Sequence, residues 1–185
     1  RAYEREREEF RTHVKQLKRR RRVHIGPIVT LVIENRDTVR FQIQEMARVE
    51  KLLSDEAIET ELRIYNPLVP APAQLRATLF IELTSKDALM AWLPKLVGIE
   101  TALGLRLANG DLVPCVVDEE HEKQLTREEV TASVHYVGWD LTPAQVEQFE
   151  AGPVTLELNH PNYTQATPLS QEAHAELLRD LTDGG

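Results

Sequence analysis

Six short segments rich in valine, isoleucine and leucine constrain the fold of this chain more than any other feature of its sequence. Aliphatic and β-branched runs of this length, bounded by turn-forming residues, are typical of β-strands. They lie at residues 28–34, 75–83, 99–107, 112–117, 130–139 and 153–158. Asn109-Gly110 stands between the third and fourth runs and is a strong hairpin signal. We therefore expect a largely antiparallel sheet.

Helical patterns fill the intervals between these predicted strands. They lie at residues 38–53, 55–64, 85–96, from Thr142-Pro143 onward, and 170–181. Asp37 is a plausible N-cap for the first of them. The chain has 185 residues, no internal repeat and no glycine-rich linker. It therefore predicts one α+β domain over residues 23–185, with helices packed on the sheet, preceded by a charged amphipathic helix over residues 1–22.

Charge is distributed unevenly between that first helix and the rest of the chain. Residues 1–22 carry a net charge of +6, whereas the whole chain carries −8. So acidic a body argues against a nucleic-acid binder. We expect the basic run from Lys18 to Arg22 to be a solvated helix end, favoured by the helix dipole; a patch for an anionic partner is the alternative. The apolar seam of Phe10, Val14 and Leu17 should be covered, either by this chain or by a second copy in a homo-oligomer.

Cysteine content and hydropathy place the chain in a broad class. A single cysteine, Cys115, excludes a disulfide framework within the chain and is expected to be a buried, inert thiol. No apolar run approaches the roughly 20 residues that span a bilayer, and no signal peptide is visible. We therefore expect a cytoplasmic protein without a membrane partner.

The predicted helix at residues 38–53 places carboxylates close to its apolar face. On a helical wheel this face is broad. It comprises Val39, Ile43, Met46, Val49 and Leu53. Glu50 falls near its centre and Glu45 at its margin. A carboxylate buried on such a face is costly unless it is paired, protonated or bound to metal. We expect Glu50 to form an internal ion pair with Arg63 or Arg76; metal ligation or acid–base catalysis is the alternative.

Two histidines are the natural partners for a metal site that includes Glu50. His135 shares a strand face with Val137, and His160 continues the inward face of Leu156 and Leu158. Two histidines and a carboxylate would suit non-haem iron, manganese or zinc. The positions are far apart in sequence, and a histidine in a strand is more often a hydrogen-bonded core residue. Three tyrosines, Tyr65, Tyr136 and Tyr163, could instead line a small-ligand pocket or pack in the core. No nucleophilic triad, Walker loop or dinucleotide fingerprint is present.

Several stretches resemble a bacterial family known as the domain of unknown function family 3501. They are RRVHIGPIVTLVIENRDTVRFQIQEMARVEK, ELRIYNPLVP, LRATLFIEL, TASVHYVGWDLT and LELNHPNY. The resemblance covers almost the whole chain. It implies a small cytoplasmic protein, often encoded near a rubrerythrin-like protein and an iron–sulfur oxidoreductase, and it supplies no agreed activity. The positions that match the most distinctive stretches are Glu45, Arg48, Glu50, Tyr65, Asn66, His135, Tyr136, His160 and Tyr163.

Three functions follow as hypotheses. The first is an accessory protein of a bacterial redox or oxidative-stress system that acts by binding partners, with the rubrerythrin-like protein or the iron–sulfur oxidoreductase as the suspected partner. The second is a metal-dependent enzyme that uses Glu50, His135 and His160, with Glu45 nearby. The third is a small-ligand binding module. The sequence does not decide whether the protein is an enzyme.

Overall fold

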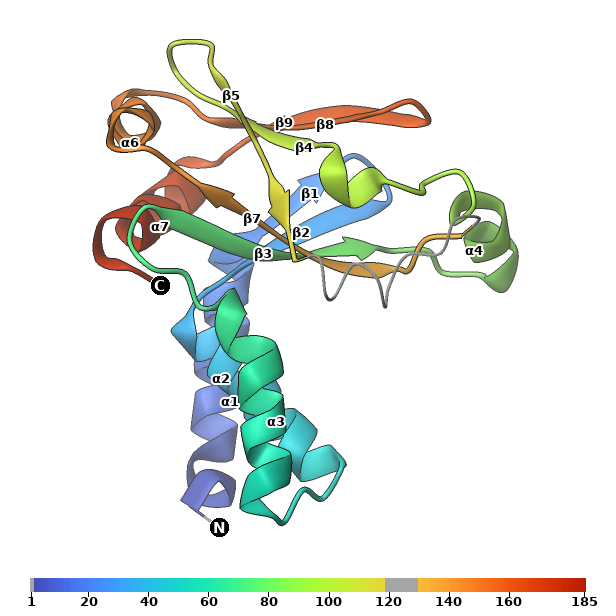
Figure 1. Ribbon diagram of the computed structural model, residues 1–185, viewed down its shortest axis with the longest axis vertical. Coiled ribbons are helices and arrows are strands. Elements are labelled where there is room, and N and C mark those ends of the chain that lie inside the picture. The colour runs from blue at the N-terminus through green and yellow to red at the C-terminus, as the bar shows by residue number, and fades with distance from the viewer. Residues whose placement is uncertain (1, 119–129) are drawn as a thin grey trace.

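The computed structural model describes residues 2–118 and 130–185 and shows an α+β protein (Figure 1). Strands and short helices form one part, called here the two-sheet body. Three other helices, α1 (Ala2–Arg21), α2 (Arg36–Val49) and α3 (Asp55–Tyr65), extend away from it and are called here the helical projection. The antiparallel pairing and the N-terminal helix predicted from the sequence are both present.

The first sheet has five antiparallel strands in the order β1-β2-β3-β7-β6. They are β1 (Arg22–Ile25), β2 (Val29–Glu34), β3 (Gln74–Ile81), β7 (Val134–Asp140) and β6 (Val116–Val117). All six residues of β2 are buried, as expected for a strand covered on both faces. Gly26-Pro27 lies in the turn between β1 and β2, where Gly26 has φ of 71°.

The second sheet has four antiparallel strands in the order β5-β4-β8-β9. They are β5 (Leu112–Pro114), β4 (Leu103–Arg106), β8 (Thr155–His160) and β9 (Tyr163–Pro168). The hairpin predicted at Asn109-Gly110 joins β4 to β5 and is confirmed. The predicted strands pair antiparallel, as expected, but they form two sheets rather than one.

The two sheets are joined at both edges. At one edge the chain passes from β5 to β6 through Cys115, so consecutive strands belong to different sheets. At the other edge the Tyr163 hydroxyl donates to the Ile25 carbonyl at 2.5 Å, and Thr167 Oγ1 donates to the His24 carbonyl at 2.9 Å. A Cβ on Gly26 would lie 2.3 Å from the Tyr163 hydroxyl, so only glycine fits this contact.

Short helices and turns complete the two-sheet body. These are α4 (Lys86–Trp92), α6 (Pro143–Ala151), α7 (Gln171–Asp183) and the 3₁₀ turns Asn66–Leu68 and Ile99–Thr101. Phe149 of α6 and Leu177 and Leu181 of α7 belong to the same apolar core as the strands. Thr142 caps α6 and Pro143 occupies its first turn, as predicted.

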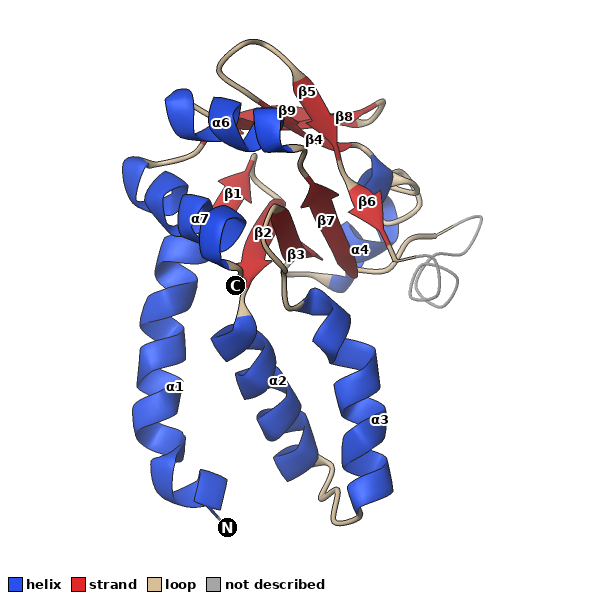
Figure 2. Ribbon diagram, turned by 60° about the vertical axis from the view of Figure 1, so that its left-hand side comes forward, coloured by secondary structure: helices blue, strands red, loops and turns tan. Residues whose placement is uncertain are grey.

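In the helical projection, α2 lies between α1 and α3 (Figure 2). Val14 and Leu17 of α1 are buried and Phe10 is half-buried, so this chain itself covers the predicted seam. Phe10 and Phe41 of α2 meet edge to face at 6.0 Å. On the other side of α2, Val39 and Ile43 pack with Leu68 in a small second core, with Met46 half-buried.

Both ends of α2 differ from the predicted ones. Asn35, not Asp37, is the N-cap: its side chain accepts from the Thr38 backbone amide, and the Thr38 hydroxyl accepts from the Asn35 amide. The helix ends at Val49, so Leu53 lies beyond it. The predicted apolar face is therefore covered only in its first half.

Two strand boundaries also need correction. The segment predicted to begin at residue 130 forms a strand only from Val134, and residues 99–101 form a 3₁₀ turn rather than the start of β4. Strand β9 was not predicted at all. Residues 118–129 are rich in acidic side chains, which favours a surface segment; apart from Asp118 they lie outside the described residues.

Candidate functional site

Glu45 ties α1 to α2. Its Oε1 accepts from the Tyr3 hydroxyl at 2.6 Å and from Arg7 Nε at 2.8 Å, and its Oε2 accepts from Arg7 Nη2 at 3.1 Å. The hydrogen bonds from Arg7 lower the pKa of Glu45 to about 2, against the opposing effect of burial. Arg48, further along α2, is exposed and donates to Glu4 at 2.9 Å. These contacts give both residues a role in holding the projection together.

Glu50 is exposed and is the C-cap residue of α2. The expectation that it lies on a buried face is therefore wrong, because the helix ends one residue before it. Neither arginine suggested as its ion-pair partner is buried with it: Arg76 donates to Asp140 at 2.8 Å, and Arg63 is exposed.

His135 and His160 are buried, as their strand faces predicted. His135 Nε2 lies 2.8 Å from Thr131 Oγ1 and 2.9 Å from the Ala132 carbonyl. His160 Nε2 lies 2.8 Å from the Val97 carbonyl, and its Nδ1 accepts from the Asn162 amide at 3.1 Å. Within residues 2–118 and 130–185, no three His, Cys, Asp or Glu side chains are grouped so that they could hold a metal ion.

Two of the three tyrosines come together. The rings of Tyr65 and Tyr136 meet at right angles with centroids 6.4 Å apart. Burial raises the pKa of Tyr136 to about 12, so its hydroxyl stays protonated at neutral pH. Tyr136 also lines a cavity of about 220 Å³ beside Arg76 and Gly138. Tyr163 packs against Trp92 at the β1–β9 edge, away from this pair.

Cys115, where the chain changes sheets, carries a half-buried thiol. Its Sγ lies 3.1 Å from the Glu100 carbonyl. Burial raises the pKa of Cys115 to about 11, so the thiol is protonated and a poor nucleophile at neutral pH.

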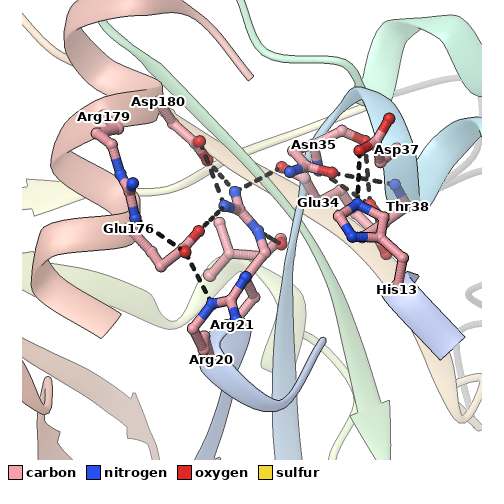
Figure 3. A network of polar contacts seen from close by, with 11 residues as sticks. His13, Arg20, Arg21, Glu34, Asn35, Asp37, Thr38, Glu176, Arg179 and Asp180 are labelled. Atoms are coloured by element: carbon pink, nitrogen blue, oxygen red, sulfur yellow. Dashed lines mark hydrogen bonds and ion pairs between the residues drawn. The ribbon is translucent and has the colours of Figure 1, made fainter. Parts of the chain in front are cut away.

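Figure 3 shows a buried ion cluster that the sequence did not predict. Arg21, the last residue of α1, is only 1% exposed. It donates to both Glu176 and Asp180 of α7, and to the carbonyls of Ile33 and Glu34 in β2. The expectation of a solvated basic end therefore fails at Arg21. Burial raises the pKa of Asp180, with Arg21 acting in the opposite direction.

A groove of about 640 Å³ runs between α2 and α3. Its apolar lining consists of Val39, Ile43, Ile58, Leu62 and Val69. Its polar lining consists of Arg36, Arg40, Gln44 and Asn66, with Gly185 at one end. Asn66, one of the residues in the family-like stretches, is also the C-cap of α3.

The free end of the projection exposes apolar side chains. Val49, at the end of α2, is 70% exposed, and Leu53, in the loop before α3, is 93% exposed. We call these two residues the tip patch. Figures 1 and 2 show that this loop lies at the end of the projection far from the sheets. The sequence had placed both residues on a covered face.

An α+β protein with a two-sheet body and a helical projection is the class that these features define. Residues 1–181 match the family described as protein of unknown function (DUF3501), and the chain belongs to that family. A crystal structure of a novel protein of unknown function from Burkholderia pseudomallei K96243 has 35% sequence identity and a TM-score of 0.88. The match covers 97% of this chain and 93% of that one. No curated protein is significantly similar. Among the described residues, no helix is long and apolar enough to cross a membrane.

Proposed function

We propose that this protein is a cytoplasmic accessory protein of a bacterial redox or oxidative-stress system, and that it binds a partner protein through the tip patch. The observation that carries the proposal is the exposure of Val49 and Leu53 at the free end of the projection. Single exposed apolar residues are normal, but these two lie four positions apart, one at the end of α2 and one in the loop that follows it.

The neighbouring helix supports the same conclusion. None of the eleven residues of α3 is buried, although Ile58, Leu62 and Tyr65 recur at helical spacing. An isolated helix of this length is marginal in water, and most helices in proteins are stabilised by packing of an apolar face. Four of the eight large apolar side chains exposed in the described residues belong to α2, α3 or their loop. A partner at this end would cover surface that the chain leaves open.

The charges around the tip patch define the chemistry of that partner. Glu50, Asp55 and Glu56 are exposed beside it, with Lys51 as the single cation between residues 50 and 56. A complementary surface would offer an apolar depression with a basic rim. The family resemblance makes the rubrerythrin-like protein and the iron–sulfur oxidoreductase the first partners to test.

The test measures binding of the purified chain to each purified protein encoded beside it. Replacing both tip residues, by Val49→Ser with Leu53→Ser, should raise the dissociation constant at least tenfold, because buried apolar anchors dominate such interfaces. Met90→Ser is the matched control, since Met90 is 67% exposed on α4 in the two-sheet body. Absence of binding to both proteins would refute these partners. Equal loss in the control and the tip variant would refute the tip patch.

A further inference from the structure

The α2–α3 groove has the size and lining of a small-molecule site. Its volume of about 640 Å³ lies within the roughly 300–1,000 Å³ that is usual for such sites. Five of its lining side chains are apolar and four are polar, so it can hold a ligand that has both an apolar and a polar part. It lies between the helices, whereas the tip patch lies at their free end, so the two surfaces can be tested separately.

The charge of the groove favours an anion. Arg36 and Arg40 line it, and among the described residues no Asp or Glu side chain does so. Arg40 donates to Glu6 at 2.5 Å and stacks on Phe10 at 4.5 Å, so it is already held in place by α1. Arg36 is exposed and makes no side-chain hydrogen bond or ion pair with any residue that the structure describes. It is therefore a cation available to a ligand.

A buried acceptor in the same groove points to a ligand with a donor. Gln44 Oε1 is buried and has no hydrogen-bond partner in the described part of the chain. A buried polar atom left without a partner is destabilising, and proteins rarely leave one unsatisfied. Gln44 is only half-buried as a residue and lines the groove, so a rotation of its side chain would present this oxygen to an N–H or O–H group of a ligand. This observation is independent of the two arginines.

The polar residues are arranged in a line. Arg36, Arg40 and Gln44 are four residues apart, so successive members lie on one helix face about 6 Å apart along the axis. Ile58 and Leu62 form a parallel apolar row on α3. A ligand that lies along the groove would meet the cation Arg36 first, an acceptor next, and aliphatic side chains along its length.

We propose that the α2–α3 groove binds an amphiphilic anion of the N-acyl amino acid type: a carboxylate, an adjacent amide N–H and a hydrocarbon chain. The carboxylate pairs with Arg36. The amide N–H donates to Gln44 Oε1. The hydrocarbon chain packs against Ile58 and Leu62.

A peptide helix fits the groove less well. Ten helical residues form a cylinder about 15 Å long and 10 Å wide, which occupies about 1,200 Å³, or roughly twice the groove. About half of such a helix would lie outside the groove, and a helix of a second copy of the chain would face the same limit. Both occupants are distinguished from the small anion by the measurements below.

The experiment is calorimetric titration of the full chain with three probes: N-dodecanoylglycine, dodecanoate and dodecyltrimethylammonium, each below its micelle concentration. N-dodecanoylglycine should bind most tightly, dodecanoate about tenfold more weakly, and the cationic probe not measurably. Equal binding of the cationic and anionic probes would refute the charge argument. No binding of either anion at about 1 mM would refute the site itself.

Substitutions assign the contacts. Arg36→Gln should lower the affinity for both anions about tenfold. Arg63 is an exposed arginine of α3 outside the groove, so Arg63→Gln should leave both affinities unchanged. Gln44→Met keeps the shape of the side chain and removes the acceptor. It should reduce the affinity for N-dodecanoylglycine to that of dodecanoate and leave dodecanoate unchanged. An unchanged preference for N-dodecanoylglycine in Gln44→Met would refute the donor contact.

Light scattering of the unliganded chain tests the alternative occupant. A molar mass equal to that of one chain agrees with the proposal. A dimer that dissociates in Leu62→Asp, with no anion bound in either form, would assign the groove to a second copy and overturn it. Val49→Ser with Leu53→Ser leaves the groove intact, so this variant should lose partner binding and keep normal anion binding. The proposed function and the groove proposal can therefore succeed or fail independently of each other.

Discussion

Leu31, Leu79 and Leu158, from three strands of the two-sheet body, are completely buried, whereas α3 in the helical projection has no buried residue. The body has one continuous apolar core that joins both sheets with α6 and α7. The projection has a small core around Val39 and Ile43 and relies on ion pairs between α1 and α2. Burial therefore accounts for the stability of the body, whereas much of the projection's apolar surface is left for another molecule.

This contrast predicts different costs for substitutions, and the largest should fall at the junction of the two parts. Arg21→Met removes the cation between α7 and β2 and leaves Asp180 in the interior without its ion-pair partner, while Glu176 keeps Arg20 and Arg179. Breaking a buried ion pair in this way costs about 3–5 kcal/mol. Urea unfolding measures the change. Arg19→Met is the control, since Arg19 is exposed and should cost less than about 0.5 kcal/mol. A similar small cost in both variants would mean that Arg21 does not couple the projection to the body.

An intermediate cost is expected inside the projection. Glu45→Gln weakens the charged hydrogen bonds from Arg7 and Tyr3 that join α1 to α2. It should lower the free energy of unfolding by about 1.5–3 kcal/mol at neutral pH. Glu59→Gln, an exposed carboxylate on α3, is the matched control and should be near neutral.

The acid dependence of the same variant follows from the direction of the pKa shift. The pKa of Glu45 is lowered in the folded state, to about 2 from the usual 4.5, so its stabilising effect is complete above about pH 4.5 and lost as the pH falls toward 2. Wild type and Glu45→Gln should therefore differ in stability at pH 7 and converge near pH 2. A difference that does not change with pH would contradict the ionised contact.

Sequence reasoning succeeded where the signal is local. The hairpin at Asn109-Gly110, the cap at Thr142-Pro143 and the inward faces of His135 and His160 depend on turn chemistry and strand period, which neighbouring residues determine. It failed where distant segments decide. The helix dipole favoured a solvated Arg21, but its partners lie 155 and 159 residues away on α7.

Two other errors have equally specific causes. Glu50 was assigned to a buried face because the wheel was extended past Val49, where the helix ends. The strand at Tyr163–Pro168 has no alternating apolar pattern, since it reads Tyr-Thr-Gln-Ala-Thr-Pro, and it forms by pairing with β8. The α2–α3 groove could not be predicted from the sequence, because it depends on how the two helices pack against each other.

The smallest predicted effect concerns the first turn of α2, where body and projection meet in the sequence. Asn35→Ala removes the side-chain acceptor for the Thr38 amide and should cost about 1 kcal/mol. Asp37→Ala, at the position that the sequence favoured as the cap, removes only an exposed contact with His13 at 2.9 Å, and should cost less than about 0.5 kcal/mol. Chemical denaturation of the two variants in parallel ranks them. A larger cost for Asp37→Ala would mean that α2 begins two residues later. Arg36 would then lie outside the helix and would not share a face with Arg40 and Gln44.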